Sequence, residues 1–230
     1  MGKIISTLIL CWVGLVSANV AVTDIFGSSM VLQRERAIPV WGTAANGESV
    51  SVTLNGQTRT TTASNGQWRV ELPAMPAGGP FTMTIQGNNT LTFTDVMVGE
   101  VWHCAGQSNM DTRMNYWEYP NLADSIKNAN YPLLRYKTMR QPKDPTKWQS
   151  VSPATVGPMS ATAYFMGREL LDNLNGVAVG MVITAVGGTT IDTWVDPVTK
   201  ASIPALAQSE AAGSMYNAWV QPVVGYGIRG

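Results

Sequence analysis

The fold is decided by one stretch of the chain, which reads Val98-Gly99-Glu100-Val101-Trp102-His103-Cys104-Ala105-Gly106-Gln107-Ser108-Asn109-Met110. Residues 98–105 are mostly apolar, which predicts a strand that is buried on both faces. Strands of this kind are typical of parallel sheets that helices cover. The strand ends in Gly106-Gln107-Ser108, and open α/β sheets bind their ligands at the carboxyl ends of such strands.

The segments after this strand alternate between helix and strand patterns. Residues 159–174 have apolar side chains spaced three and four apart and end in Asn175-Gly176, which predicts a helix. Residues 177–186 form an almost unbroken apolar run that ends in Gly187-Gly188, which predicts another buried strand. We also expect a short strand at 133–137, a helical stretch within 205–224 and the start of a further strand at 226–230. This alternation predicts an α/β domain.

A different pattern precedes the decisive stretch. Between residues 30 and 95, short runs of alternating apolar and polar residues are separated by turn dipeptides such as Asn55-Gly56 and Asn65-Gly66. Such runs predict antiparallel strands with one solvated face, arranged as a small β-sandwich. We therefore place a domain boundary near Asp95, with a β-sandwich domain at 19–95 and an α/β domain at 96–230.

The first residues have the pattern of a secretory signal peptide. Lys3 supplies a positive charge, residues 4–16 are mostly apolar, and Val16-Ser17-Ala18 offers small residues for cleavage. We expect residues 1–18 to be removed, a mature N-terminus at Asn19 and an exported protein, periplasmic or extracellular; an uncleaved anchor is the alternative. No later stretch approaches the ~20 apolar residues that a membrane helix needs, so we expect no membrane association after cleavage.

Composition excludes several classes of function. Fifteen Lys and Arg residues balance fifteen Asp and Glu residues, so the chain has no basic field to hold nucleic acid. One His and two Cys cannot build a multi-ligand His or Cys metal centre, and we expect no metal and no organic cofactor. Cleavage after residue 18 would remove Cys11 and leave Cys104 without a disulfide partner. The oligomeric state stays open.

Ser108 and the glycine pair are the first candidates for chemistry. A serine at a strand end faces a cleft, where its own N–H and those of the next turn are available to an oxyanion. Taken alone, a serine in this position is more often a helix N-cap, and a glycine pair such as Gly187-Gly188 is more often a tight turn.

The sequences around these residues favour a catalytic role for Ser108 and the glycine pair. The stretch from Val98 to Met110 closely resembles the nucleophile block of bacterial sialate O-acetylesterases, which are SGNH hydrolases. Further segments resemble family landmarks and occur in family order between Met30 and Gly230: Met30-Val31-Leu32-Gln33-Arg34, Pro39-Val40-Trp41-Gly42, Gly66-Gln67-Trp68, Trp148-Gln149, Ala163-Tyr164-Phe165-Met166-Gly167-Arg168-Glu169-Leu170, Gly187-Gly188-Thr189-Thr190-Ile191-Asp192-Thr193-Trp194 and Met215-Tyr216-Asn217-Ala218.

The resemblance implies a flavodoxin-like α/β esterase domain behind an N-terminal β-domain. It implies Ser108 as nucleophile, with the second oxyanion N–H from Gly188 or, as the alternative, Gly187, and an O-acetylated sugar as substrate. We expect substrate contacts from residues near these groups, namely Gln107, Asn109, Arg113, Trp117, Asp192 and Trp194. Arg113 is the candidate for the carboxylate of sialic acid, since arginine pairs with carboxylates in a bidentate fashion.

Some features depart from the family. This chain has His103 where the family has an apolar residue, Ala105 in place of Ser and Asp192 in place of Glu. The family's Gly-Glu-Ser-Asn block, which completes the oxyanion hole, has no counterpart up to Gly230. The Asp-x-x-His segment that supplies the general base has none either. We therefore expect the chain to be the N-terminal part of a longer enzyme, catalytically incomplete as it stands.

Other interpretations stay open at this point. His103, the sole histidine, lies inside the strand, so we expect it to be a buried, hydrogen-bonded residue and not the base. Cys104 is expected to be a small buried hydrophobe, and Asp111 to be either structural or in contact with substrate. The aromatic rings of 116–119 either stack on sugars or pack the loop onto the domain. Without its base, the chain is alternatively a carbohydrate-binding module or a structural fragment.

Overall fold

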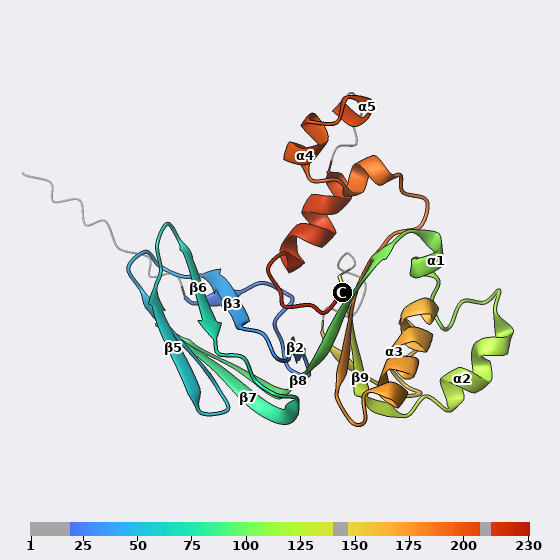
Figure 1. Cartoon of the computed structure of the whole chain (residues 1–230), viewed down its shortest axis with the longest axis horizontal. Helices are drawn as coiled ribbons and strands as arrows, with labels where there is room; N and C mark the ends of the chain where they lie inside the picture. The colour runs from blue at the N-terminus through green and yellow to red at the C-terminus, as the bar shows by residue number, and fades with distance from the viewer. Residues whose placement is uncertain (1–18, 140–146, 208–212) are drawn as a thin grey trace, which may run out of the picture.

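The computed structural model describes residues 19–139, 147–207 and 213–230. The predicted signal peptide lies outside these residues. Figure 1 shows two halves side by side, an all-β half with strands β3 to β7 and a half in which helices accompany the strands. A projection that carries helices α4 and α5 stands above them.

The all-β half contains two layers of mainly antiparallel strands that share one apolar core. Its turns follow the prediction, because Asn55-Gly56 and Asn65-Gly66 all have positive φ, as two-residue hairpins require. The alternation is confirmed in β6, where Trp68, Val70 and Leu72 are buried. The strands are β1 (Ala21–Val22), β2 (Val31–Gln33), β3 (Ile38–Thr43), β4 (Ser49–Leu54), β5 (Gln57–Thr62), β6 (Gln67–Leu72) and β7 (Gly78–Gln86). One sheet has the order β1-β3-β6, whereas β5, β4 and β7 lead into a larger sheet.

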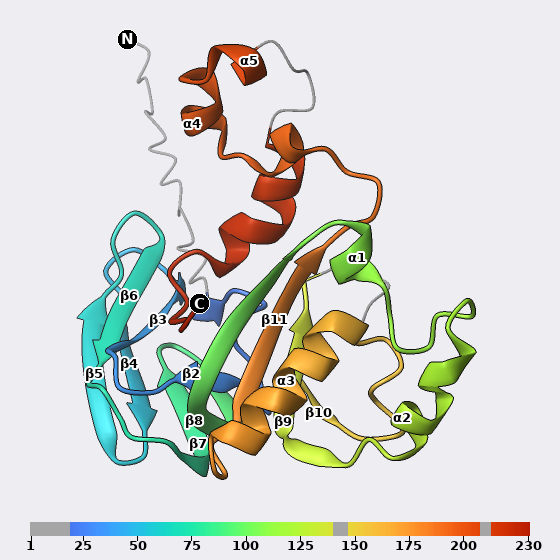
Figure 2. The ribbon, with the colours of Figure 1, turned by 45° about the vertical axis from the view of Figure 1, so that its right-hand side comes forward.

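Strand β8 (Thr90–Gly106) joins the two halves. Residues before Gly99 pair antiparallel with β7, and residues 100–106 pair parallel with β11. One eight-stranded sheet therefore runs through the molecule (Figure 2). Seven of its strands follow the order β10-β9-β11-β8-β7-β4-β5, and the eighth, β2, pairs parallel with β8. The boundary predicted at Asp95 falls inside this continuous strand, at a residue with a positive φ of 58°.

The α/β half contains the predicted strands and helix as β9 (Tyr131–Thr138), β11 (Val179–Ala185) and α3 (Ala161–Asn173). It also contains a short strand that was not predicted, β10 (Gln149–Val151). All seven residues of β11 are buried, as a central strand covered on both faces requires. Helix α3 begins after Ser160, whose side chain accepts a hydrogen bond from the Ala163 N–H at 3.2 Å. It packs closely on the sheet, since a Cβ at Gly167 would lie 2.5 Å from the Leu134 side chain.

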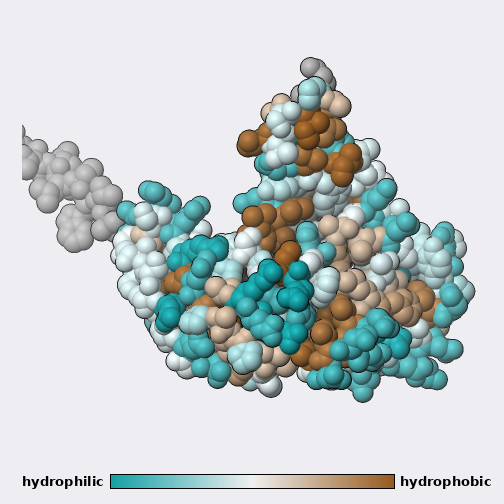
Figure 3. Space-filling view, in the orientation of Figure 1, coloured by the Kyte–Doolittle hydropathy of each residue, from teal (hydrophilic) through white to brown (hydrophobic). Residues whose placement is uncertain are grey.

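The remaining helices are short. They are α1 (Ser108–Asp111), η1 (Pro120–Leu122), α2 (Ala123–Lys127), η2 (Ile191–Trp194), α4 (Pro197–Ala201), α5 (Pro204–Ala207), the π-helix η3 (Tyr216–Val220) and η4 (Gln221–Val223). The last two confirm helical structure within 205–224, whereas residues 208–212 lie outside the described part. Figure 3 shows apolar residues gathered on the projection, where Val198 is 81% exposed. In the described part of the chain, no helix is long and apolar enough to cross a membrane.

The strand expected to begin at residues 226–230 is not a regular strand. The Arg229 N–H donates to the Val101 carbonyl at 2.7 Å, and the His103 N–H donates to the Gly230 carbonyl at 2.9 Å. These two bonds are offset by one residue from a regular parallel ladder. The segment therefore lies along the edge of β8 without forming a strand.

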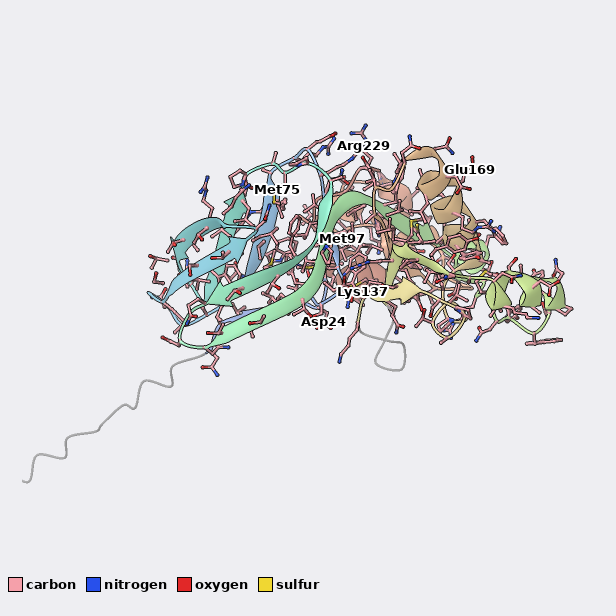
Figure 4. The ribbon with its side chains drawn as sticks, turned by 90° about the horizontal axis from the view of Figure 1, so that it is seen from below. Asp24, Met75, Met97, Lys137, Glu169 and Arg229 are labelled. Carbon is pink, nitrogen blue, oxygen red and sulfur yellow. The ribbon has the colours of Figure 1, made fainter. Side chains whose placement is uncertain are left out.

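Polar contacts hold the two halves together. Arg135 on β9 is 5% exposed, and its guanidinium donates to the Ser29 carbonyl at 3.1 Å and to an Asp95 carboxylate oxygen at 2.8 Å. Figure 4 places Met97 at the same junction, with Asp24 and Lys137 close to each other nearby. Burial lowers the pKa of Lys137 to about 8, and the nearby charge of Asp24 opposes this shift.

We predict that Arg135→Ala lowers the free energy of unfolding by roughly 2–4 kcal/mol, because it leaves partly buried carbonyl groups without a donor. Urea denaturation measures the change. Arg59→Ala, at an exposed position of β5, is the matched control and should cost less than about 0.5 kcal/mol. Equal losses in the two variants would contradict the assigned role of Arg135.

Candidate active site

The site forms where two neighbouring parallel strands end. Gly106 at the end of β8 is paired with Ala185 at the end of β11, and the Val186 N–H donates to the Gly106 carbonyl at 3.2 Å. The segments that follow the two strands therefore start side by side. As a result, a Cβ built on Gly187 would lie 3.8 Å from the Ser108 Cβ.

Ser108 is the first residue of the α1 turn. The N-cap is Gln107, which makes no side-chain capping bond, so the interpretation of Ser108 as an N-cap is wrong. The Ser108 carbonyl accepts hydrogen bonds from the Thr112 N–H at 3.0 Å and the Thr112 hydroxyl at 2.9 Å. These contacts fix the backbone of Ser108 and leave the residue exposed to solvent.

A cavity of about 680 Å³ opens in front of Ser108. Four of the other predicted site residues line it: Asn109, Arg113, Trp117 and Gly187. The lining also includes residues that sequence analysis did not propose as ligands, namely Thr112, Asn115 and Glu118. Their signal in the sequence was only their closeness to Ser108. Gln107, Gly188, Asp192 and Trp194 are not among the lining residues.

The two glycines after β11 differ in what they offer. The Gly187 N–H donates to the Asp111 carboxylate at 2.9 Å. Gly188 has a φ of +76°, a left-handed conformation that favours glycine, although a Cβ there would meet no atom within 4 Å. Gly188 is thus required for the backbone conformation and not for space. The role of either N–H as an oxyanion donor stays a prediction.

Asp192 and Trp194 shape the next segment. The Thr190 hydroxyl donates to the Asp192 carboxylate, and the Trp194 indole N–H donates to the Thr189 hydroxyl at 2.8 Å. These bonds hold the segment after the glycines in its turn. Substrate contact by Asp192 or Trp194 stays a prediction.

Three aromatic residues in the segment after α1 line the cavity. The exposed fractions of Tyr116, Trp117 and Tyr119 are 41%, 79% and 46%. The ring centroids of Tyr116 and Trp117 are 6.2 Å apart, and those of Tyr116 and Tyr119 are 5.9 Å apart. Trp117 is therefore largely open to solvent, whereas Tyr116 and Tyr119 are more than half buried. Stacking of these rings on a sugar stays a prediction.

The sole histidine, His103, does not line the cavity at Ser108. The His103 Nε2 atom is 2.7 Å from the Thr184 hydroxyl, and burial lowers the pKa of the imidazole. The ring lines a separate cavity of about 160 Å³ together with Val182 and Val220. The prediction of a hydrogen-bonded strand histidine is confirmed.

Cys104 is the other strand residue that sequence analysis weighed. It is buried, and burial raises the pKa of its thiol to about 12. This confirms it as an inert hydrophobic residue. Within the described ranges, no group of three or more His, Cys, Asp or Glu side chains is arranged to hold a metal ion.

Residues 98–223 match the family described as carbohydrate esterase, sialic acid-specific acetylesterase. The chain belongs to this acetylesterase family. The matched range contains Ser108, both glycines and the aromatic segment. The resemblance noted in the sequence is thereby confirmed.

Individual acetylesterases show how much of the family the chain spans. The chain is 31% identical to the sialate O-acetylesterase of Homo sapiens over 196 residues, which are 73% of this chain and 37% of the human protein. For the Rattus norvegicus protein the identity is 32% over 194 residues, with coverages of 72% and 35%. The crystal structure of a carbohydrate acetylesterase from Xanthomonas citri has a TM-score of 0.81 and 29% identity, and the match covers 92% of this chain and 50% of that one. The chain thus spans little more than a third of these curated relatives.

The low pKa of His103 predicts a pH dependence of stability. An unfolded histidine titrates near 6.5, whereas the folded ring titrates lower, so below pH 6.5 the unfolded state binds more protons. The contribution of His103 to the free energy of unfolding should therefore be greatest above about pH 6.5 and decrease as the pH falls below that value. His103→Gln should flatten this part of the curve, measured by urea denaturation at a series of pH values. An identical slope in both proteins would contradict the prediction.

Proposed function

We propose that this protein hydrolyses O-acetyl esters of sialic acid or a related sugar, with Ser108 as the nucleophile. The observation that carries the proposal is the exposed Ser108 on the first turn after β8, beside the glycine turn and at a cavity with three aromatic rings. The family membership supports the same chemistry.

The reaction proceeds in two steps. The Ser108 hydroxyl oxygen attacks the acetyl carbonyl carbon, its proton passes to a general base, and the sugar oxygen leaves with a proton as the acetyl-serine forms. Water then attacks the acetyl-serine, and acetate leaves as Ser108 regains its proton. In both steps the Ser108 N–H and one glycine N–H stabilise the oxyanion, and one such donor typically contributes about 10²- to 10³-fold.

We propose that the general base comes from outside these 230 residues. The sole histidine, His103, is bonded to Thr184 and lines a different cavity from Ser108. The Asp-x-x-His segment that the resemblance implies is the source we expect. Without its base, a serine esterase keeps only residual catalysis of roughly 10³- to 10⁴-fold over water.

Contacts with the sugar come from the cavity lining. Aromatic faces with polar edges suit the faces of sugar rings, and Trp117 presents the most exposed of the three rings. Arg113 lies in the same lining, where a guanidinium can pair with the carboxylate of sialic acid. Asn109 adds a polar side chain next to the nucleophile.

We predict that Ser108→Ala abolishes turnover of acetylated sialic acid and of small aryl acetates, because it removes the attacking oxygen. Acetate release should be measured in the 230-residue chain and in a version extended through the base. Ser49→Ala, at an exposed position of β4, is the control and should leave turnover unchanged. Turnover that survives in the Ser108 variant would contradict the proposal.

We predict that Arg113→Ala, in the extended protein, raises KM for acetylated sialic acid by about 10-fold or more, the loss expected for one charge-assisted hydrogen bond. Initial rates on the sialic acid ester and on a neutral acetylated sugar measure the effect. The neutral ester has no anion to pair and should be nearly unaffected. Equal losses on both esters would show that Arg113 supports the loop and not the substrate.

A second candidate function is sugar binding without turnover. It is favoured by the aromatic rings of Tyr116, Trp117 and Tyr119 together with the position of His103 away from Ser108. Calorimetric titration with acetylated and deacetylated sialic acid distinguishes the two functions. Binding without acetate release, in the extended protein as well, would favour the binding module.

A further inference from the structure

We infer that Asp111 is a positioning residue for the proposed esterase: its carboxylate holds the Gly187 N–H and so fixes the glycine turn against the nucleophile. This inference rests on the proposed function. The sequence is consistent with either a structural role or substrate contact for Asp111. In the structure, its carboxylate contacts the glycine turn.

Asp111 lies on the same helical turn as Ser108. Its backbone N–H donates to the Gln107 carbonyl at 2.8 Å, which fixes the residue relative to the nucleophile. Its Oδ2 atom accepts from the Gly187 N–H at 2.9 Å, across a separation of 76 residues. The bond therefore connects the segments that follow β8 and β11.

The contact is close on both sides. A Cβ built on Gly187 would lie 3.5 Å from Asp111 Oδ2 and 3.7 Å from the Ser108 Cα. Gly187 thus lies next to both the carboxylate and the backbone of Ser108. A shift of this turn would change the distance between Ser108 and any donor that the turn supplies.

Other bonds hold the turn to different parts of the molecule. The Val186 N–H donates to Gly106 on β8, and the Thr189 hydroxyl donates to the Val186 carbonyl at 2.8 Å. These contacts tie the turn to the sheet and to itself. The Asp111 bond ties it to the helical turn that carries Ser108.

The same bond distinguishes the two glycine donors. The Gly187 N–H is directed at the Asp111 carboxylate, so it is not available to an oxyanion in this arrangement. Gly188 follows it with a φ of +76° and provides the next N–H of the turn. This bond therefore favours Gly188 over Gly187 as the oxyanion donor, as the resemblance implies.

The test compares Asp111→Ala and Asp111→Asn in the extended protein, with Asp172→Ala at an exposed position of α3 as the control. NMR hydrogen exchange follows the Gly187 amide, and kcat and KM are measured on an aryl acetate. The rate at which a fluorophosphonate labels Ser108 gives a second measure of the nucleophile. Asparagine retains a carbonyl acceptor without the charge.

We expect Asp111→Ala to speed exchange of the Gly187 amide by about 10-fold or more and to lower kcat and Ser108 labelling by about 10- to 100-fold, part of the value of one oxyanion donor. KM should change little, because the turn acts after binding. Asp111→Asn should restore most of both properties, and Asp172→Ala should change neither.

Two results would overturn the inference. Unchanged Gly187 exchange in Asp111→Ala would show that the carboxylate does not hold the turn. Faster exchange with unchanged kcat and labelling would show that the bond is structural only. If the wild-type extended protein neither turns over acetate esters nor labels at Ser108, the proposed function itself fails, whatever the Gly187 amide shows.

Discussion

The parallel pairing of β8 with β11 is the constraint on which the site depends. Gly106 and Ala185 are partners at the last position of this ladder. A slip of the register by one residue would move every side chain of a strand to the opposite face, and it would separate Ser108 from Gly187. The complete burial of β11 and the close packing of α3 on the sheet stabilise this pairing register.

Strand β8 also connects the site to the all-β half of the molecule. Its first part belongs to the all-β half and its last part leads to Ser108. Glu100, at the transition, is 3% exposed and accepts from the Arg34 guanidinium at 2.6 Å. Since Arg34 directly follows β2, the all-β half bonds to β8 a short distance before the end of that strand. The all-β half thus supports the strand that leads to Ser108.

Much of the α/β half could be predicted because its elements carry strong local patterns. The apolar runs of β8 and β11 and the periodicity of α3 have lengths that fit only one kind of element each. Local patterns could not show that β8 continues through Asp95, because a bulge with positive φ looks like a turn in the sequence. They also could not show the end of the chain as a bonded but irregular segment, since its pairing depends on a distant strand.

The candidate site was predictable to a similar degree. Ser108 and Gly187 were predicted because they follow buried strands and lie in motifs that resemble the family's, and the structure brings them together. The bond between Asp111 and Gly187 joins residues far apart in sequence, so no local pattern reports it. The open position of the Trp117 ring is likewise a property of the loop conformation. Sequence alone identified the residue types at the site but not which of them face the cavity.

The most direct test of the assigned chemistry is a crystal structure of the protein, extended through its base, after reaction with a phosphonate ester. We expect the phosphorus to be bonded to Ser108 Oγ, with one phosphonate oxygen accepting from the N–H groups of Ser108 and Gly188. We also expect the Gly187 N–H to remain on the Asp111 carboxylate. An adduct on another residue, or an oxygen that points away from both the Ser108 N–H and the glycine turn, would contradict Ser108 as the nucleophile of this site.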